Sequence, residues 1–351
     1  MEIAAIVQPV TLTRGPFNRP RTIAYPAELG NNGGAMTGAE FAHNVERAHR
    51  RIRGDIVRTP LLPSALLSRS TGADVRIKWE CEQTTGSFKL RGAFNAVRAL
   101  SPARRRSGIV SASTGNHGLA MIRVARITGA PLELYVPDTI TAIKKRKLRR
   151  GGARLIVRGA TCEQSEIIAR AAAAARGRTF ISPYNDWNVV FGQGTIGLEI
   201  NQDAPDADVV LVPVGGGGLA AGIAGYLRSR SRPIEIWGVE PVRSAFMKAA
   251  FAAGRLVEIV ERPTLADAVA GGLEPGAITF GLCRKYLDGI IAVGESTLRS
   301  ALRTLIGLRG GPVEGAGALA LAGLMTERER FRGRRIILIV SGRNGESGFH
   351  R

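Results

Sequence analysis

The 351-residue sequence lacks the features that would mark a membrane protein, a disulfide-stabilised protein or a metalloprotein. No uninterrupted apolar run approaches the roughly 20 residues that a bilayer-spanning helix needs. The N-terminus shows no basic stretch followed by an apolar run and a cleavage site, so we expect a cytoplasmic protein that does not enter membranes. The three cysteines, Cys81, Cys162 and Cys283, are far apart and form no CxxC pair, which predicts reduced, buried thiols and no metal site.

Acidic residues are scarce relative to basic ones, with 29 Asp and Glu against 49 Lys and Arg, which gives a formal net charge of +20. Such a charge attracts polyanions. The densest basic run, residues 144–150, lies on a predicted helix, and further runs occupy residues 104–106 and 328–335. Only Phe331 is interleaved with these runs, so repeated base-stacking contacts are missing. We expect no specific nucleic-acid recognition and at most weak, non-specific binding, with a functional basic patch as the alternative.

The sequence pattern separates an N-terminal segment without periodicity from a longer part with alternating strand and helix patterns. Residues 1–37 contain several prolines and a glycine–asparagine cluster without periodicity, which predicts a disordered extension. From Val75 onward, short apolar runs alternate with helical patterns, as in parallel sheets connected by crossover helices. The sequence therefore predicts an α/β fold. The predicted strands span residues 75–80, 108–112, 132–136, 154–157, 179–182, 209–214, 234–239, 290–293 and 336–340. The predicted helices span residues 38–53, 88–100, 117–128, 163–176, 188–201, 219–230, 297–308 and 317–326.

The segment Ser87 to Ala93 places one lysine between small or apolar neighbours at the predicted start of a helix. Packing among apolar groups disfavours the charged form of Lys89, and a neutral amine can form a Schiff base with an aldehyde. By itself the pattern also fits an ordinary solvated lysine. Two further loops make us favour the catalytic interpretation.

The first of these loops is Gly215, Gly216, Gly217 and Gly218, which follows a buried strand and leads into a helix at Leu219. Glycines allow the backbone to approach a ligand closely, and the N–H groups at a helix start bind anions. The spacing matches neither the dinucleotide fingerprint nor the P-loop. We predict a phosphate site here, and a tight turn that serves helix packing is the alternative.

The second loop, residues 111–118, follows a strand and leads into another helix, so it lies at the strand edge where α/β sheets bind ligands. Its hydroxyl and N–H groups suit a substrate carboxylate, and the Asn116 amide suits a phenolic oxygen. A simple helix cap is the alternative for this loop, and His117 fits a structural role equally well. The candidate substrate-binding residues are Ser113, Thr114, Gly115, Asn116 and His117.

At the far end of the chain, the apolar run 336–340 brings Ser341 to the same kind of strand edge. Its hydroxyl can hydrogen-bond a ring nitrogen, although an ordinary polar residue at a strand end is equally compatible. A lysine, an asparagine loop and a polyglycine phosphate site together indicate pyridoxal phosphate.

These motifs resemble those of fold-type II pyridoxal-phosphate enzymes, in particular the serine/threonine dehydratase branch. The segments that match best are residues 87–93, 113–118, 192–199, 215–219, 313–318 and 341–344. Within the branch, residues 263–267 and 341–344 are most similar to dehydratases of hydroxyectoine breakdown. The resemblance implies a tryptophan synthase β-like α/β fold with two open, mostly parallel sheets flanked by helices. The implied large, cofactor-binding domain spans residues 38–107 and 185–351, and the small domain spans 108–184.

The resemblance also implies roles for single residues. Lys89 becomes the Schiff-base lysine and the general base for the Cα proton, and Phe88 packs near the cofactor ring. Asn116 binds the 3-hydroxyl, Gly215 to Leu219 bind the phosphate, and Glu314 lines the ring pocket. The roles of Lys89 and of the four glycines agree with the interpretation drawn above from the residues themselves.

The implied reaction follows from Ser341 at the ring nitrogen. A hydroxyl there, unlike a carboxylate, does not enforce protonation of the pyridine, which favours loss of a β-leaving group over transamination. We therefore expect α,β-elimination of water from a β-hydroxy amino acid, threonine/serine-like or hydroxyectoine-derived, giving a 2-oxo acid and ammonia. The resemblance further implies a homodimer.

Three departures from the family pattern leave alternatives open. Thr114 stands where serine racemases carry a serine, so racemisation stays possible, as does β-replacement. Arg343 stands where threonine dehydratases carry a glycine, so the resemblance does not determine which amino acid is the substrate. Glu240 lacks the further acidic group of the family's cation site, so we predict no metal there. A more remote alternative is a non-catalytic polyanion-binding protein.

Overall fold

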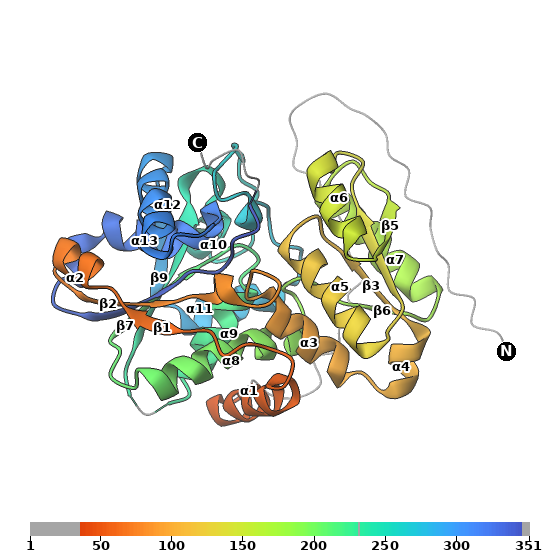
Figure 1. Ribbon diagram of the computed structural model, residues 1–351, viewed down its shortest axis with the longest axis horizontal. Helices are drawn as coiled ribbons and strands as arrows, with labels where there is room; N and C mark the ends of the chain where they lie inside the picture. The colour runs from red at the N-terminus through yellow and green to blue at the C-terminus, as the bar shows by residue number, and fades with distance from the viewer. Residues whose placement is uncertain (1–35, 231, 346–351) are drawn as a thin grey trace. The chain divides into compact units, whose positions relative to one another are not determined.

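The computed structural model describes residues 36–230 and 232–345, which all belong to one unit spanning Ala35–Arg351. Apart from residues 36 and 37, the predicted N-terminal extension lies outside the described residues. Ten strands of the described chain form a six-stranded sheet, in the order β1-β2-β10-β7-β8-β9, and a four-stranded sheet, in the order β5-β4-β3-β6 (Figure 1). All strand pairs are parallel except β1 with β2. The predicted α/β fold with two open, mostly parallel sheets is confirmed.

All nine predicted strands are present, with ends that shift by one or two residues. The tenth, β1, is not among the predicted strands. The six-stranded sheet consists of β1 (Leu61–Pro63), β2 (Asp74–Lys78), β7 (Val209–Pro213), β8 (Glu235–Pro241), β9 (Gly289–Val293) and β10 (Arg335–Ile339). The four-stranded sheet consists of β3 (Ile109–Ala112), β4 (Leu132–Val136), β5 (Arg154–Val157) and β6 (Thr179–Phe180). The four-stranded sheet lies within residues 108–184, while the exact domain boundaries stay a prediction.

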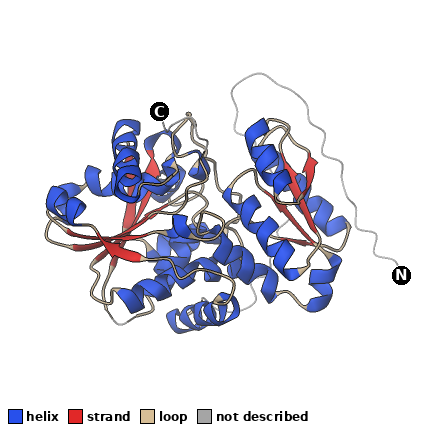
Figure 2. Ribbon diagram, in the orientation of Figure 1, coloured by secondary structure: helices blue, strands red, loops and turns tan. Residues whose placement is uncertain are grey.

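Helices cover both sheets (Figure 2). The predicted helices, including the basic one, correspond to α1 (Gly38–Ile52), α3 (Lys89–Ala99), α5 (Asn116–Thr128), α6 (Ala142–Arg150), α7 (Cys162–Ala175), α8 (Trp187–Asp203), α9 (Gly218–Leu227), α12 (Glu295–Arg309) and α13 (Gly315–Thr326). Those that the sequence pattern did not reveal are α2 (Ala65–Thr71), α4 (Pro102–Ser107), α10 (Phe246–Ala253) and α11 (Ile278–Tyr286). These four have at most nine residues each, too few turns for a clear apolar period.

The first helix shows why local sequence predicts some ends well. The Thr37 hydroxyl accepts the N–H of Glu40, and the Glu40 carboxylate accepts the N–H of Thr37 at 2.8 Å. This reciprocal capping satisfies two N–H groups that a helix start leaves without partners. Phe41, Val45 and Ala48 follow at helical spacing and are buried, so α1 presents one apolar face to the core.

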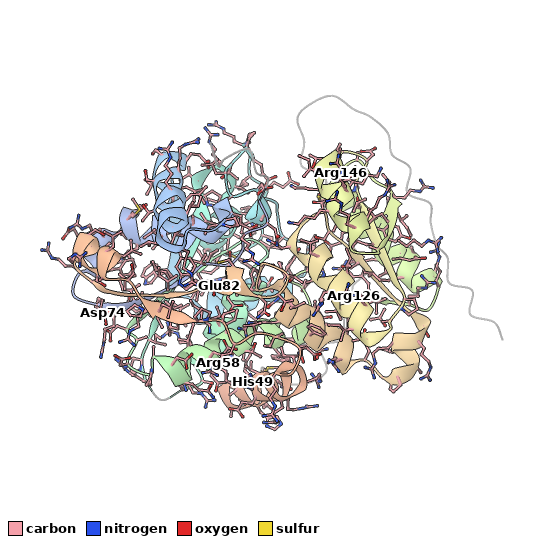
Figure 3. All side chains as sticks on the ribbon, in the orientation of Figure 1. His49, Arg58, Asp74, Glu82, Arg126 and Arg146 are labelled. Atoms are coloured by element: carbon pink, nitrogen blue, oxygen red, sulfur yellow. The ribbon has the colours of Figure 1, made fainter. Side chains whose placement is uncertain are left out.

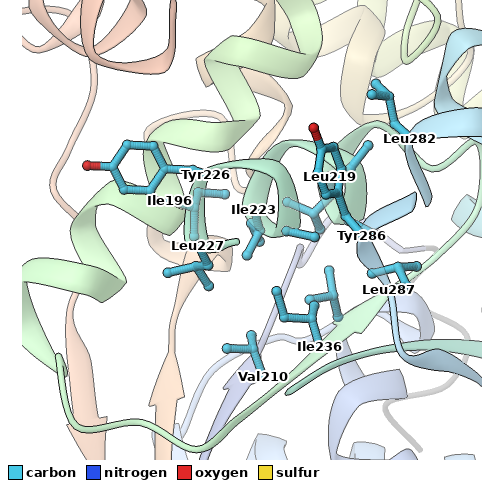
Figure 4. Close-up of a cluster of buried hydrophobic side chains, with 14 of the residues drawn as sticks. Ile196, Val210, Leu219, Ile223, Tyr226, Leu227, Ile236, Leu282, Tyr286 and Leu287 are labelled. Carbon is cyan, nitrogen blue, oxygen red and sulfur yellow. The ribbon is translucent and has the colours of Figure 1, made fainter. Parts of the chain in front are cut away.

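The six-stranded sheet is buried on both faces because its strands carry apolar side chains at successive positions. Val209 and Leu211 of β7 lie in the cluster that includes α12 and α13 residues. Val210 and Val212 lie in the cluster that includes α8 and α9 residues, and Figure 4 shows Val210 in this cluster with Ile223 of α9. This arrangement is that of parallel strands with helices on each side. It fixes the carboxyl ends of the strands, where the candidate residues lie.

The structure shows where the three cysteines and the densest basic run lie. Cys81 and Cys283 are buried, but Cys162 is exposed, because it occupies the first turn of α7. The prediction of three buried thiols is therefore wrong for Cys162. The basic run lies on α6, where Arg146 is exposed (Figure 3). Among the helices that the structure describes, none is both long and apolar enough to cross a bilayer.

Candidate active site

Two segments far apart in the chain pair beside the candidate lysine. Ser87 and Gly342 form an isolated antiparallel bridge, and the Phe88 N–H donates to the carbonyl oxygen of Ser341 at 3.1 Å. The Arg343 N–H donates to the carbonyl oxygen of Gly86 at 2.9 Å. The structure thus brings the start of α3 and the end of β10 together, as the two motifs require.

Lys89 is the first residue of α3 and is partly buried. Its Nζ donates a 2.8 Å hydrogen bond to the carbonyl oxygen of Pro183 and lies 5.2 Å from the centre of the Phe88 ring. Burial lowers the pKa of Lys89 to about 8, although the carboxylates of Glu166 and Glu314 act in the opposite direction. The amine is therefore far easier to deprotonate than a solvated lysine.

Asn116 and Glu314 form the second part of the site. Asn116 begins α5, and its Nδ2 donates to Glu314 Oε1 at 2.7 Å. Asn344 joins both, because its N–H donates to Glu314 Oε2 at 2.9 Å and its Nδ2 donates to Asn116 Oδ1 at 2.8 Å. This triad connects the four-stranded sheet to the loop after β10.

Glu314 is buried at the start of α13, and its electrostatics reflect that position. Burial raises the pKa of Glu314 to about 7, the hydrogen bond from Asn116 opposes the shift, and the charge of Asp267 adds to it. Lys147 of α6 lies nearby and donates to Asn344 Oδ1 at 2.7 Å. Within the triad, Glu314 is therefore the one group whose protonation changes near neutral pH, and the two amides respond only through their hydrogen bonds to it.

The polyglycine loop has the geometry of an anion site. Gly217 has a φ of +81°, and a Cβ at Gly216 would lie 2.4 Å from the ring of Tyr184. Only glycine fits both positions. Within residues 36–230 and 232–345, the N–H groups of Gly215 to Gly218 donate no hydrogen bond. These donors stand at the N-terminus of α9, the arrangement that binds phosphate.

His117 is buried behind this site. Its Nε2 lies 3.1 Å from Ser111 Oγ, which donates to the carbonyl oxygen of Ile181 at 2.8 Å. Burial, together with the positive charge of Lys89, lowers the pKa of His117 to about 3, so the ring is neutral. Its Nδ1 has no hydrogen-bond partner among the residues that the structure describes. This environment agrees with a structural role for His117.

Residues 52–342 match the family model of pyridoxal-phosphate dependent enzymes. The chain belongs to this family. It is 36% identical over 301 residues to the L-threonine ammonia-lyase of Thermotoga maritima, covering 86% of this chain and 75% of that protein. It is 35% identical over 302 residues to an L-threo-3-hydroxyaspartate ammonia-lyase of a Pseudomonas species, covering 86% and 94% of the two chains.

The fold agrees with this assignment. The solved structure of maize serine racemase superimposes with a TM-score of 0.82 at 29% identity, covering 88% of this chain and 94% of that one. The chain is thus a pyridoxal-phosphate-dependent enzyme of the threonine ammonia-lyase-like type. The hydroxyectoine link predicted from two segments has no counterpart among these similarities.

The residues present fit the cofactor of this enzyme family. The unsatisfied N–H groups of the polyglycine loop suit its phosphate, and the lowered pKa of Lys89 suits an amine that bonds to its aldehyde. The Asn116 amide and the buried Ser341 hydroxyl are neutral groups that suit the ring oxygen and nitrogen. In the pyridoxal-phosphate enzyme, these residues would hold the cofactor.

The remaining predicted residues, of the substrate loop and the phosphate site, differ in burial and in hydrogen bonding. Ser113 Oγ accepts the N–H of Gly115 at 3.2 Å, which closes a local turn, but α5 has no side-chain N-cap hydrogen bond, so neither Ser113 nor Thr114 serves as the helix cap of the alternative interpretation. Thr114 is half-buried in the loop before α5, and Leu219 is buried in the first turn of α9. These positions are compatible with the predicted substrate loop and phosphate site, whose roles stay predictions.

Sequence reasoning missed the segment that follows β6. Pro183 accepts the hydrogen bond from Lys89, and Tyr184 covers the polyglycine loop while its hydroxyl accepts the N–H of Glu274 at 3.0 Å. Burial, with the charge of Glu274, raises the pKa of Tyr184, so the phenol stays protonated. Because both residues follow a strand end, the argument applied to the loop after Ala112 would have found them.

A buried ion network beneath the site was also missed. Arg91 donates to Glu80 Oε1 at 2.8 Å and to Glu199 Oε1 at 2.7 Å, and Lys78 donates to Glu199 Oε2 at 2.6 Å. All four side chains are at most 1% exposed. Two cations therefore balance two carboxylates, and the network ties the start of α3, which carries Lys89, to β2 and α8.

Glu240 occupies the position discussed for a cation. Its two oxygens accept the N–H groups of Met247 and Lys248, each at 2.9 Å, which caps α10. Among the described residues, no group of three or more His, Cys, Asp or Glu side chains could hold a metal ion. The expectation of no metal at Glu240 stays a prediction.

Proposed function

We propose that this enzyme eliminates water from a β-hydroxy amino acid of the threonine or serine type, and that the products are a 2-oxo acid and ammonia. The observation that carries the proposal is the placement of Lys89, with a pKa near 8, beside the Ser341 segment. Similarity to a threonine ammonia-lyase and to a hydroxyaspartate ammonia-lyase supports the reaction type.

The proposed chemistry divides between cofactor and protein. When bound, pyridoxal phosphate withdraws electrons from Cα of the amino acid. Lys89 removes the Cα proton, because burial keeps a neutral amine accessible near physiological pH. The Ser341 hydroxyl would donate a hydrogen bond to the ring nitrogen of the cofactor without transferring its proton, which favours loss of the β-hydroxyl as water over transamination. Asn116 and the polyglycine loop orient the reacting groups and add no proton step.

The finer assignments belong to the same proposal. We retain hydroxyectoine-derived amino acids as one substrate class, on the segments 263–267 and 341–344 alone. We also retain a homodimer, a cytoplasmic location, and a small domain of residues 108–184 inserted into the large one. The separate four-stranded sheet supports this division.

Racemisation is the second candidate function. A racemase needs a proton donor on the face of Cα opposite the lysine, and Thr114 offers a hydroxyl in the candidate substrate loop. The similarity to maize serine racemase favours this candidate. Incubation in D₂O separates the two reactions, because racemisation incorporates deuterium at Cα of recovered substrate, whereas committed elimination does not.

The experiment that tests the proposal is a substrate panel. The purified protein, loaded with pyridoxal phosphate, is incubated with serine, threonine, threo-3-hydroxyaspartate and 3-hydroxy-2,4-diaminobutyrate, and 2-oxo acid and ammonia are measured. We expect both products in equal amounts from at least one member, and their loss by more than 1000-fold in Lys89→Ala, which lacks the base. Lys285→Ala, a change at a peripheral lysine, is the control. Bound cofactor without product from any member would contradict the proposed reaction.

A further inference from the structure

Arg343 occupies the rim of the candidate site. Its backbone is fixed by the hydrogen bond to Gly86, two residues before Phe88. A Cβ built on Gly86 would lie 3.1 Å from Arg343 Cγ and 3.1 Å from Asn344 Oδ1, so the arginine stem and the Asn344 amide flank the same point. Because Asn344 Nδ2 also contacts Asn116, the arginine stem lies beside the polar triad of the site.

Lys147 approaches the same place from the other sheet. Its Nζ hydrogen-bonds Asn344 Oδ1 at 2.7 Å. Burial lowers the pKa of Lys147, Glu314 raises it, and the positive charge of Arg343 lowers it further. The two cations therefore act on each other, and both border the Asn344 amide.

The acidic groups nearby do not neutralise this pair. Glu314 is engaged by Asn116 and Asn344 and titrates near pH 7. The Asp267 carboxylate is paired with Lys144 at 3.1 Å. Across residues 36–230 and 232–345, neither Arg343 nor Lys147 forms an ion pair. Two positive charges thus stand at the rim of the site without an anionic partner from the described chain.

We propose that Arg343 and Lys147 determine substrate specificity by accepting a second carboxylate, so that the preferred β-hydroxy amino acid is a dicarboxylate such as 3-hydroxyaspartate. This inference rests on the proposed elimination reaction and names its substrate class. Arginine offers paired donors that match a carboxylate, and lysine adds a point charge. A substrate with a methyl or hydrogen at the same position gains nothing from either cation.

The test compares kcat/KM for threo-3-hydroxyaspartate and threonine in the loaded enzyme. We expect the wild type to prefer 3-hydroxyaspartate. Arg343→Gly and Lys147→Gln should each lower that kcat/KM by at least about 10-fold and change the threonine value by less than about 3-fold. Arg343→Lys keeps the charge but loses the paired donors, so its preference should fall between those of the wild type and Arg343→Gly. Arg106→Gln, which removes an exposed arginine of α4, should change neither value.

Binding of succinate supplies a readout that needs no turnover. Isothermal titration of the loaded enzyme should give at least about 10-fold weaker succinate binding in Arg343→Gly and Lys147→Gln, and unchanged binding in Arg106→Gln. A wild type that prefers threonine, or variants that lose both substrates equally, would overturn the specificity role while leaving the elimination reaction standing. Absence of product from every β-hydroxy amino acid would instead overturn the proposed function and this inference with it.

Discussion

Asn116 donates a 2.7 Å hydrogen bond to Glu314, although 198 positions separate the two residues. The bond joins the first residue of α5 to the residue that precedes α13, and so joins two helix N-termini at the candidate site. Because Asn344 hydrogen-bonds both side chains, a change in the charge of Glu314 alters the hydrogen bonds of all three residues. The protonation of Glu314 should therefore be visible in how the stability of the protein depends on pH.

Glu314→Gln should alter how stability depends on pH. The pKa of Glu314 is raised from 4.5 to about 7, so the folded state binds more protons than the unfolded state between these values. Its stabilising contribution is therefore present below pH 4.5 and is lost as pH rises through about 7. The difference in unfolding free energy between wild type and variant should fall by on the order of 2 to 3 kcal/mol from pH 5 to pH 8. Urea unfolding of the cofactor-free protein measures it.

An exposed glutamate provides the control for that experiment. Glu329→Gln removes a carboxylate whose side chain is 75% exposed, and it reports the effect of losing any surface charge. If the difference in unfolding free energy between wild type and Glu314→Gln stayed constant from pH 5 to pH 8, the assignment of Glu314 as a buried group that titrates near neutrality would be wrong.

The rate of cofactor loading should depend on the ionisation of Lys89. A lysine with a pKa of about 8 is largely neutral at pH 9, whereas a solvated lysine is not. The second-order rate of pyridoxal phosphate uptake, followed by visible absorbance, should therefore rise with pH and level off above about 8. Nα-acetyl-lysine with the same cofactor is the control, and its rate should continue to rise. A protein rate that rises in parallel with the control between pH 8 and 10 would contradict the buried environment of Lys89.

Arg91 and Arg98 lie on the same helix but in different surroundings, which gives a matched pair. Arg91→Met removes a fully buried cation and leaves two carboxylates against one lysine, which should cost about 3 to 5 kcal/mol of stability. Arg98→Met breaks a half-exposed pair with Asp55 and should cost no more than about 1 kcal/mol. Chemical denaturation of the two variants measures both values. Equal losses would mean that the network does not hold α3 in place.

The three thiols should react at different rates. Cys162 is exposed, whereas Cys283 is buried and burial raises the pKa of Cys81 to about 12. A thiol reagent should therefore modify one thiol rapidly in the folded protein and the other two only after denaturation. Cys162→Ser should abolish the fast phase. Rapid labelling that persists in this variant would place one of the other thiols at the surface.

The sequence predicted the helix starts at which three candidate site features stand. Lys89, Asn116 and the end of the polyglycine loop each lie at the start of a helix that the local pattern had placed within one residue. The nine predicted strands were found for a similar reason, since each is a short apolar run bounded by polar or turn residues. The missed helices are short and lack an extended apolar period.

Contacts between distant segments were not predictable in the same way. Arg91 meets Glu199 across 108 positions, and Lys78 meets Glu199 across 121. Nothing in the local sequence distinguishes these charged residues from solvated ones. Tyr184 follows β6 of the four-stranded sheet, yet it covers the polyglycine loop, which follows β7 of the six-stranded sheet. Such residues become visible only when the sheets are assembled.

The most direct test of the account is to locate the lysine that carries the cofactor. Borohydride reduction of the loaded enzyme fixes pyridoxal phosphate to the lysine it has bound, and peptide mass spectrometry then identifies the residue. The account predicts one modified peptide, which contains Lys89, and no modification of that peptide in Lys89→Ala. Modification of a different lysine would contradict the placement of the active site. Stable cofactor uptake without modification of any lysine would contradict it as well.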